Sequence, residues 1–232
     1  MTTLRELVGD AVVWRGVLDR ALMPQPASAA GKRLADAARA GNWSAVMKVL
    51  DDEKHWVSVN QWRPGGTAWL TPLHHAARNA APIEVVEELL HRGALRSLRD
   101  AKGRTAHDLV SSKEGIKEHH SARLSALLWQ QHESPLGGGR IEALDANLAT
   151  VIEGCMEEWF GHRDLRAALR YPPVDILHEP PGQQVWFRVP YTHGGFHIAL
   201  LSGYLEVTSG KDDLAPPTQV HVVTHEGAVR VQ

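Results

Sequence analysis

The chain has 232 residues, of which 43% are hydrophobic and 22% charged, and this is the composition of a globular protein, not of a disordered chain. Its formal net charge of −2, from 25 Lys and Arg against 27 Asp and Glu, provides no excess of cations for a phosphate backbone and argues against a nucleic-acid partner. No apolar run reaches the roughly 18 to 20 residues that cross a bilayer, and the first residues lack a signal-peptide pattern, so we expect a cytoplasmic protein without a membrane partner.

The first predicted element is a helix over residues 1–23, where apolar residues recur at helical spacing from Leu4 onward. Pro24 and Pro26 then break this pattern, and small residues follow them. We therefore expect residues 1–30 to form a helix and a linker that cap the next structural unit.

The most specific motif of the chain is Thr71-Pro72-Leu73-His74-His75-Ala76-Ala77, which matches the T-P-L-H-x-A signature of the ankyrin repeat. A second helix is predicted after it, from Ile83 to Leu90, and Gly93 is placed to end that helix. Thr105 opens a degenerate copy of the motif 34 positions after Thr71. A further copy without the T-P-L-H opening is predicted over residues 34–50.

On these motifs, residues 31–133 resemble the ankyrin-repeat family, with about three repeats of which the outer two are degenerate. The resemblance implies a short α-solenoid that binds a protein partner through its hairpin fingers and its concave face, without catalysis. It also implies a structural role for His74, whose ring would bond backbone groups between repeats.

The composition changes again at residues 134–140, a glycine-rich segment that we predict to be a linker. Apolar residues then follow one face of a helix over residues 141–159, and from Val185 onward a period near two predicts strands joined by glycine-containing turns. The fold class is therefore α+β, with residues 141–232 forming a helix packed on an antiparallel β-meander. The apolar face of the helix could instead meet a second chain in a homodimer. The run Val189–Ile198 resembles a small β domain that follows ankyrin repeats in some uncharacterised bacterial proteins.

Three of the eight Trp residues fall between His55 and Trp69, a finger longer than a standard ankyrin turn. Trp and Arg are enriched at binding hot spots because they bury a large area while ordering few torsions. We predict that this finger binds a partner protein through Trp56, Trp62, Arg63 and Trp69. The alternative is that Trp56 and Trp69 fold back over the repeat and fill the space that the longer finger creates.

The ankyrin pattern maps further contact positions to the concave face, namely Asp36, Arg39, His75, Arg78 and Asn79. These residues are polar, as a contact surface requires, although a solvated face has the same composition. In the C-terminal domain, Tyr191 and His193 are the candidates for an exposed loop that contacts a partner.

The histidine count of 14 raises the question of a metal site. His193 and His197 are four positions apart, but in a strand this spacing separates two side chains by about 13 Å, which is too far for one ion. No H-E-x-x-H, P-loop or nucleophile-elbow motif is present, and the single cysteine, Cys155, lies in an apolar helix face where a thiol fills the core. We therefore expect no metal, no cofactor and no catalytic residue.

Together these features predict a non-catalytic scaffold that binds a protein partner through the Trp finger and the concave face. A narrower hypothesis is an immunity or antitoxin-type protein that blocks a bacterial toxin, although no residue selects it. The alternative is a hydrolase-type enzyme with its active site in the C-terminal β domain, around His193, His197 or Glu206, and with repeats that recruit substrate. A deep pocket with convergent polar residues would favour the enzyme, and a shallow surface would count against it.

Overall fold

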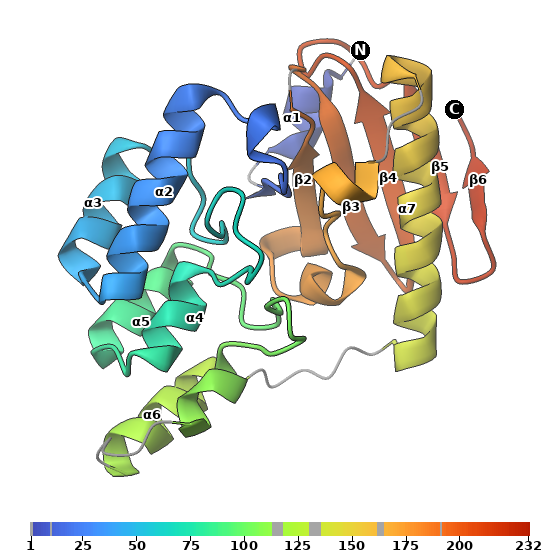
Figure 1. Cartoon of the computed structure of the whole chain (residues 1–232). Helices are drawn as coiled ribbons and strands as arrows, with labels where there is room; N and C mark the ends of the chain where they lie inside the picture. The colour runs from blue at the N-terminus through green and yellow to red at the C-terminus, as the bar shows by residue number, and fades with distance from the viewer. Residues whose placement is uncertain (1, 10, 113–117, 130–135, 162–164, 191) are drawn as a thin grey trace. The chain divides into compact units, whose positions relative to one another are not determined.

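The computed structural model describes residues 2–9, 11–112, 118–129, 136–161, 165–190 and 192–232. The chain divides into two compact units (Figure 1). The repeat unit comprises Leu18–Gln131, and the sheet unit comprises Met1–Val17 together with His132–Gln232. Helices and strands are both present, which confirms the expected α+β class. Among the described residues, no helix combines the length and the apolar character that a membrane crossing requires.

The sheet unit is built on a six-stranded sheet in the order β1-β2-β3-β4-β5-β6. Successive strands from β2 to β6 pair antiparallel, whereas β1 pairs parallel with β2. The strands span Val12–Trp14 (β1), Gln184–Arg188 (β2), Gly195–Leu201 (β3), Tyr204–Gly210 (β4), Gln219–Val223 (β5) and Ala228–Arg230 (β6). From β2 to β6, each strand therefore lies beside the strand that follows it in the chain, and a short connection joins the two.

Helix α7, Gly138–Phe160, covers one face of this sheet (Figure 1). Its apolar residues, including Leu144, Leu148 and Ile152, are almost fully buried. Near its end, the Trp159 ring stacks on Phe196 of β3 with the ring centroids 5.2 Å apart. The apolar face of the predicted helix thus packs on the sheet, as expected, and is not available for the alternative, a homodimer through residues 141–159.

The N-terminal segment differs most from the sequence prediction. Helix α1 spans only Leu4–Val8, and β1 follows it. The backbone N–H of Leu4 donates to the Ala215 carbonyl at 2.9 Å, and the Leu4 side chain is fully buried beside Ala11 and Trp186. The expected helix over residues 1–23 is therefore wrong. Of the residues 1–30 that were expected to cap the repeats, the first 17 belong instead to the sheet unit.

The repeat unit begins with the short 3₁₀ helix η1, Arg20–Leu22, and then consists of helices paired in sequence. They are α2 (Gln25–Ala40) with α3 (Trp43–Asp52), α4 (Pro72–Arg78) with α5 (Ile83–His91), and the 3₁₀ helix η2 (His107–Ser112) with α6 (Glu118–Leu128). Pro26 lies in the first turn of α2, where its missing N–H costs no hydrogen bond, so this proline begins a helix and does not form a linker. One core joins all three pairs, with Leu34, Leu73 and Leu124 each at most 1% exposed.

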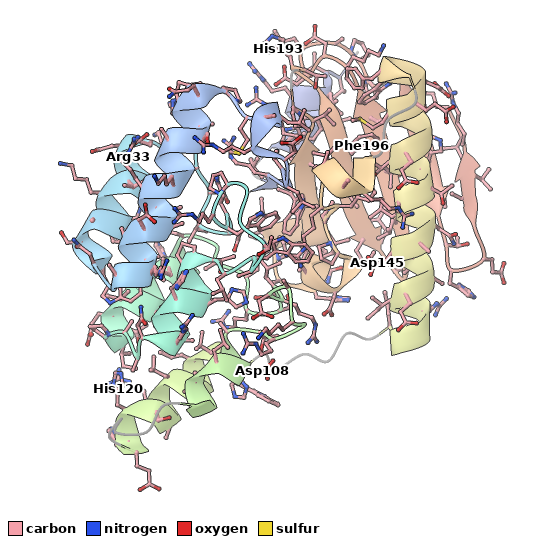
Figure 2. The ribbon with its side chains drawn as sticks, viewed as in Figure 1. Arg33, Asp108, His120, Asp145, His193 and Phe196 are labelled. Carbon is pink, nitrogen blue, oxygen red and sulfur yellow. The ribbon has the colours of Figure 1, made fainter. Side chains whose placement is uncertain are left out.

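The remaining short elements connect α7 to the sheet. They are α8 (Leu165–Ala168) and the 3₁₀ helices η3 (Val174–His178) and η4 (Pro181–Gln183). Asp145 of α7, labelled in Figure 2, accepts a hydrogen bond from the Val174 N–H at 2.7 Å and so joins α7 to the start of η3. Burial, together with the charge of Asp175, raises the pKa of the Asp145 carboxyl to about 6, although the hydrogen bond from Val174 opposes this rise.

Candidate functional site

The finger between α3 and α4 folds back against α2. Gly31 makes this packing close: a Cβ at this position would lie 2.4 Å from the Gln61 side chain and 2.7 Å from the ring of Pro64. Asn60 anchors the same segment to the next repeat, because its side chain donates to the Gly93 carbonyl at 2.8 Å and accepts from the Leu95 N–H at 2.9 Å. The finger is thus part of the packed repeat unit.

The structure corrects the expectation for Trp62. Its ring is only 4% exposed and lies beside that of Trp69, with centroids 6.4 Å apart. Trp62 is therefore not an exposed anchor for a partner. Trp69 is half-buried, as the fold-back alternative expects, whereas Trp56 is 40% exposed and remains accessible.

The structure brings two of the predicted contact residues together, because Arg63 of the finger forms an ion pair with Asp36 of α2. A second ion pair joins Arg33 of α2, labelled in Figure 2, to Glu53 at 2.5 Å. In each pair, the negative charge of the carboxylate offsets the positive charge of the arginine on the surface of the first repeat.

The motif histidine has the structural role that the resemblance implies. The Thr71 N–H donates to Nδ1 of His74 at 3.3 Å, and the Thr71 hydroxyl lies 2.8 Å from the same atom. Because Nδ1 accepts, Nε2 carries the proton, and it lies 3.3 Å from the Arg104 carbonyl of the next repeat. His74 thus takes part in capping the N-terminus of α4 and also contacts the Arg104 carbonyl in the turn that precedes the next repeat.

His75 was expected on the concave contact surface, but the structure buries it to 8% exposure. Burial, followed by the nearby charges of Arg78, His74 and Arg39, lowers the pKa of its imidazole to about 4. The ring is therefore neutral at pH 7, and its burial corrects its predicted role as an exposed contact.

Asn79, another predicted contact residue, uses its side chain inside the repeat unit. Its amide donates to the carbonyls of Ala38 and Arg39, at 3.2 and 3.3 Å, and so satisfies the C-terminal end of α2. A histidine of α6 makes a related contact to the turn between α4 and α5. Nε2 of His120, labelled in Figure 2, lies 3.1 Å from the Ala81 carbonyl and 3.3 Å from that of Ala80.

On the predicted concave face, Arg39 at the end of α2 and Arg78 at the end of α4 are exposed, as is Asp36, which is paired with Arg63. We refer to Arg39 and Arg78 as the arginine pair. Their charges both act on His75, and Asn79 ties the ends of the two helices together. Within the described ranges neither arginine forms an ion pair, in contrast to Arg33 and Arg63. Among the described residues, the arginine pair is thus the part of the predicted contact surface whose positive charge has no ion-pair partner.

In the sheet unit, Tyr191 lies outside the described residues. His193, labelled in Figure 2, is exposed, and its carbonyl accepts from the Asp213 N–H at 3.2 Å. His197 is buried, and its Nε2 lies 2.9 Å from Oε1 of Gln184. Over the parts of the chain that the structure describes, no group of three His, Cys, Asp or Glu residues is arranged to hold a metal ion.

Cys155 is buried between α7 and the sheet, where its thiol donates to Oε1 of Gln219 at 3.1 Å. Burial raises the pKa of this thiol above its ordinary value. Because the thiolate is the reactive form, Cys155 is a poor nucleophile in this environment.

Gly31, Asn60 and His120 are structural residues that the sequence reasoning did not select. A glycine inside a helical pattern was the available signal for Gly31, because such a residue usually marks a close approach of another segment. No spacing rule pointed to Asn60 or His120, whose partners lie 30 to 40 positions away in the chain.

The comparisons with known proteins agree with this geometry for the central repeat. A family model, the ankyrin repeat, matches residues 69–101, the segment that carries the T-P-L-H motif, α4 and α5. A comparison with curated proteins gave no match. The matched segment suggests a role in protein–protein interaction, since ankyrin repeats are typically interaction modules and not enzymes.

Proposed function

We propose that the repeat unit binds an acidic segment of a partner protein and that the arginine pair, Arg39 and Arg78, supplies the charged contacts. The observation that carries this proposal is the contrast along α2: Arg33 pairs with Glu53, Asp36 pairs with Arg63, and Arg39 has no ion pair within the described residues. An exposed guanidinium without a partner is free to form a bidentate contact with a carboxylate.

The surroundings of the arginine pair support a preorganised surface. Asn79 fixes the end of α2 against the end of α4, so the two arginines extend from helix ends that are held together. A rigid support lowers the entropy lost on binding and therefore favours affinity. His75, between them, is neutral at pH 7 and adds no competing charge.

Trp56 is the aromatic residue of the finger that fits a contact role, because 40% of it is exposed. We propose it as an apolar contact at the rim of the same interaction. Trp62 has no part in this proposal, since it is buried, and Arg63 and Asp36 enter only as a pair that would have to separate before either could bind.

The direct test measures binding of a fluorescent, Asp- and Glu-rich synthetic peptide to the full chain by anisotropy. Arg78→Glu and Arg39→Glu should each weaken binding by about tenfold or more, as expected for an arginine at a binding hot spot. Lys48→Glu is the matched control, because Lys48 is an exposed cation on α3, the second helix of its pair. It should change the affinity by less than about twofold.

Equal weakening by all three variants would show that the peptide senses only net charge, and the proposal would then be wrong. Capture from the source cell with wild type and Arg39→Glu/Arg78→Glu, followed by mass spectrometry, extends the test to the natural partner. A captured toxin would support the narrower immunity-type hypothesis, which stays a prediction.

A further inference from the structure

Within the part of the chain that the structure describes, backbone groups on the outer edge of β6 have no hydrogen-bond partner. β6 is the last strand of the sheet order, and its register pairs Val229 with Val222 of β5. The Val231 N–H donates to the Val220 carbonyl at 2.8 Å, and the Thr224 N–H donates to the Gly227 carbonyl at 2.8 Å. Since backbone groups alternate in direction along a strand, those of Val229 also point to β5, and those of Ala228 and Arg230 point away from the sheet.

Exposed valines reach this edge on the face of the sheet opposite α7. Gln219 of β5 bonds Cys155 of α7, so alternate residues of β5, beginning with Val220, point to the other face. Four valines share that face and are neighbours across β5 and β6: Val220, Val222, Val229 and Val231. We call them the valine stripe. Val229 is 65% exposed and Val231 is 59% exposed, whereas the two valines of β5 are half-buried.

We propose that β6 pairs antiparallel with β6 of a second copy of this chain, so that two sheets join edge to edge across a twofold axis at Val229. In this register, Ala228 of each copy faces Arg230 of the other. These are the two residues whose backbone groups point outward, and the pairing forms four backbone hydrogen bonds. An exposed edge strand is a template for such an addition.

Two observations bear on a second copy as the occupant of this edge. The valine stripe extends to the edge, and the twofold axis places Val229 beside Val229 of the second copy, so the two stripes continue as one apolar surface. The charge pattern is compatible with a second copy and selects the register, because a register centred on Arg230 would place two guanidinium groups opposite each other, whereas the proposed register places each opposite an alanine. Because β6 has only three residues, the dimer is expected to be weak and dependent on concentration.

The first experiment is sedimentation equilibrium of the full chain over a range of concentrations. The mass of wild type should rise from the monomer value of 25.6 kDa toward twice that value. Val229→Lys adds a charge to the edge and should remain monomeric, and Arg230→Pro removes one outward N–H and should weaken the dimer. Leu214→Lys is the matched control, since Leu214 is 61% exposed in a loop outside the strands, and it should dimerise as wild type does.

A crosslinking experiment tests the register. Val229 would face its own copy in a pair without direct hydrogen bonds, where Cα atoms lie about 4.5 Å apart, within the range that a disulfide spans. Val229→Cys should therefore form a disulfide-linked dimer under mild oxidation, and Leu214→Cys should not. A wild type that stays monomeric would overturn the proposal, as would a dimer that persists in both Val229→Lys and Arg230→Pro. A monomer that instead binds an extended peptide at this edge would also overturn it.

Discussion

Gly31 of α2 and Gln61 of the finger lie so close that a Cβ on the glycine would be 2.4 Å from Nε2 of the Gln61 side chain. The same Cβ would meet the ring of Pro64 at 2.7 Å. Gly31→Ala should therefore force the finger away from α2. Overpacking of this kind costs about 1 to 3 kcal/mol, even though alanine favours the helix. Urea unfolding of the repeat unit measures this cost, and Ala29→Gly, a change in the same helix that adds no atoms, is a control for helix propensity. A variant as stable as wild type would contradict the close packing.

The least and the most exposed tryptophans of the finger should respond differently to truncation. Trp62→Ala removes a ring that is 4% exposed and is expected to destabilise the protein by about 3 to 5 kcal/mol. Trp56→Ala removes a ring that is 40% exposed and should cost about 1 kcal/mol or less. Thermal unfolding of both variants compares the two costs. If Trp62→Ala left the melting temperature unchanged, the finger would not be packed as described.

Leu4 distinguishes the two possible roles of the N-terminal segment. Leu4→Ala removes a fully buried side chain from the sheet unit and should destabilise that unit by about 2 to 5 kcal/mol. Leu7→Ala, at a residue that is 40% exposed in the same helix, is the matched control and should have a small effect. Hydrogen exchange followed by mass spectrometry reports each unit separately. A loss of protection in the repeat unit alone would favour the capping role that the sequence predicts.

Asp145 should make the stability of the sheet unit depend on pH. The folded pKa of about 6 lies above the ordinary value of 3.8, so the stabilising contribution is complete below about pH 4 and is lost as the pH rises through 6. Asp145→Asn keeps an acceptor for the Val174 N–H but carries no charge. It should be more stable than wild type at pH 8, by about 1 to 3 kcal/mol, and nearly equal at pH 4.

Urea midpoints at pH 4, 6 and 8 test this difference. Glu142→Gln, which removes an exposed carboxylate from the same helix, should shift the midpoint little at any of these pH values. A constant gap between Asp145→Asn and wild type across the three pH values would show that the carboxyl does not titrate in this range.

The central repeat could be predicted from the sequence because its signals are local. Thr71 and His74 are three positions apart, and together they close the start of α4. Their chemistry is complete within one turn, so a short motif is enough to specify it. The helix over 141–159 was predictable for a similar reason, since its apolar periodicity is long and regular.

The sheet unit's first strand could not be predicted in the same way. β1 has three residues, too few to show a period of two, and its partner β2 is far away in the chain. The packing of the finger also depends on distant residues, because Gly31 makes room for Gln61, which lies 30 positions later. The residue types typical of contact surfaces could be recognised in the sequence. The sequence did not indicate which arginines form ion pairs within the protein, as Arg63 does with Asp36.

The position of the repeat unit within the sequence has a consequence for synthesis. Val12 of β1 pairs with Val185 of β2, which is 173 positions later in the chain. At typical rates of translation, β1 emerges from the ribosome about 10 to 35 seconds before its partner strand. The repeat unit, whose helices pair with neighbours in sequence, can fold during this interval and bring a long stretch of chain into a compact body. The nascent chain should therefore acquire its helices first and close its sheet last.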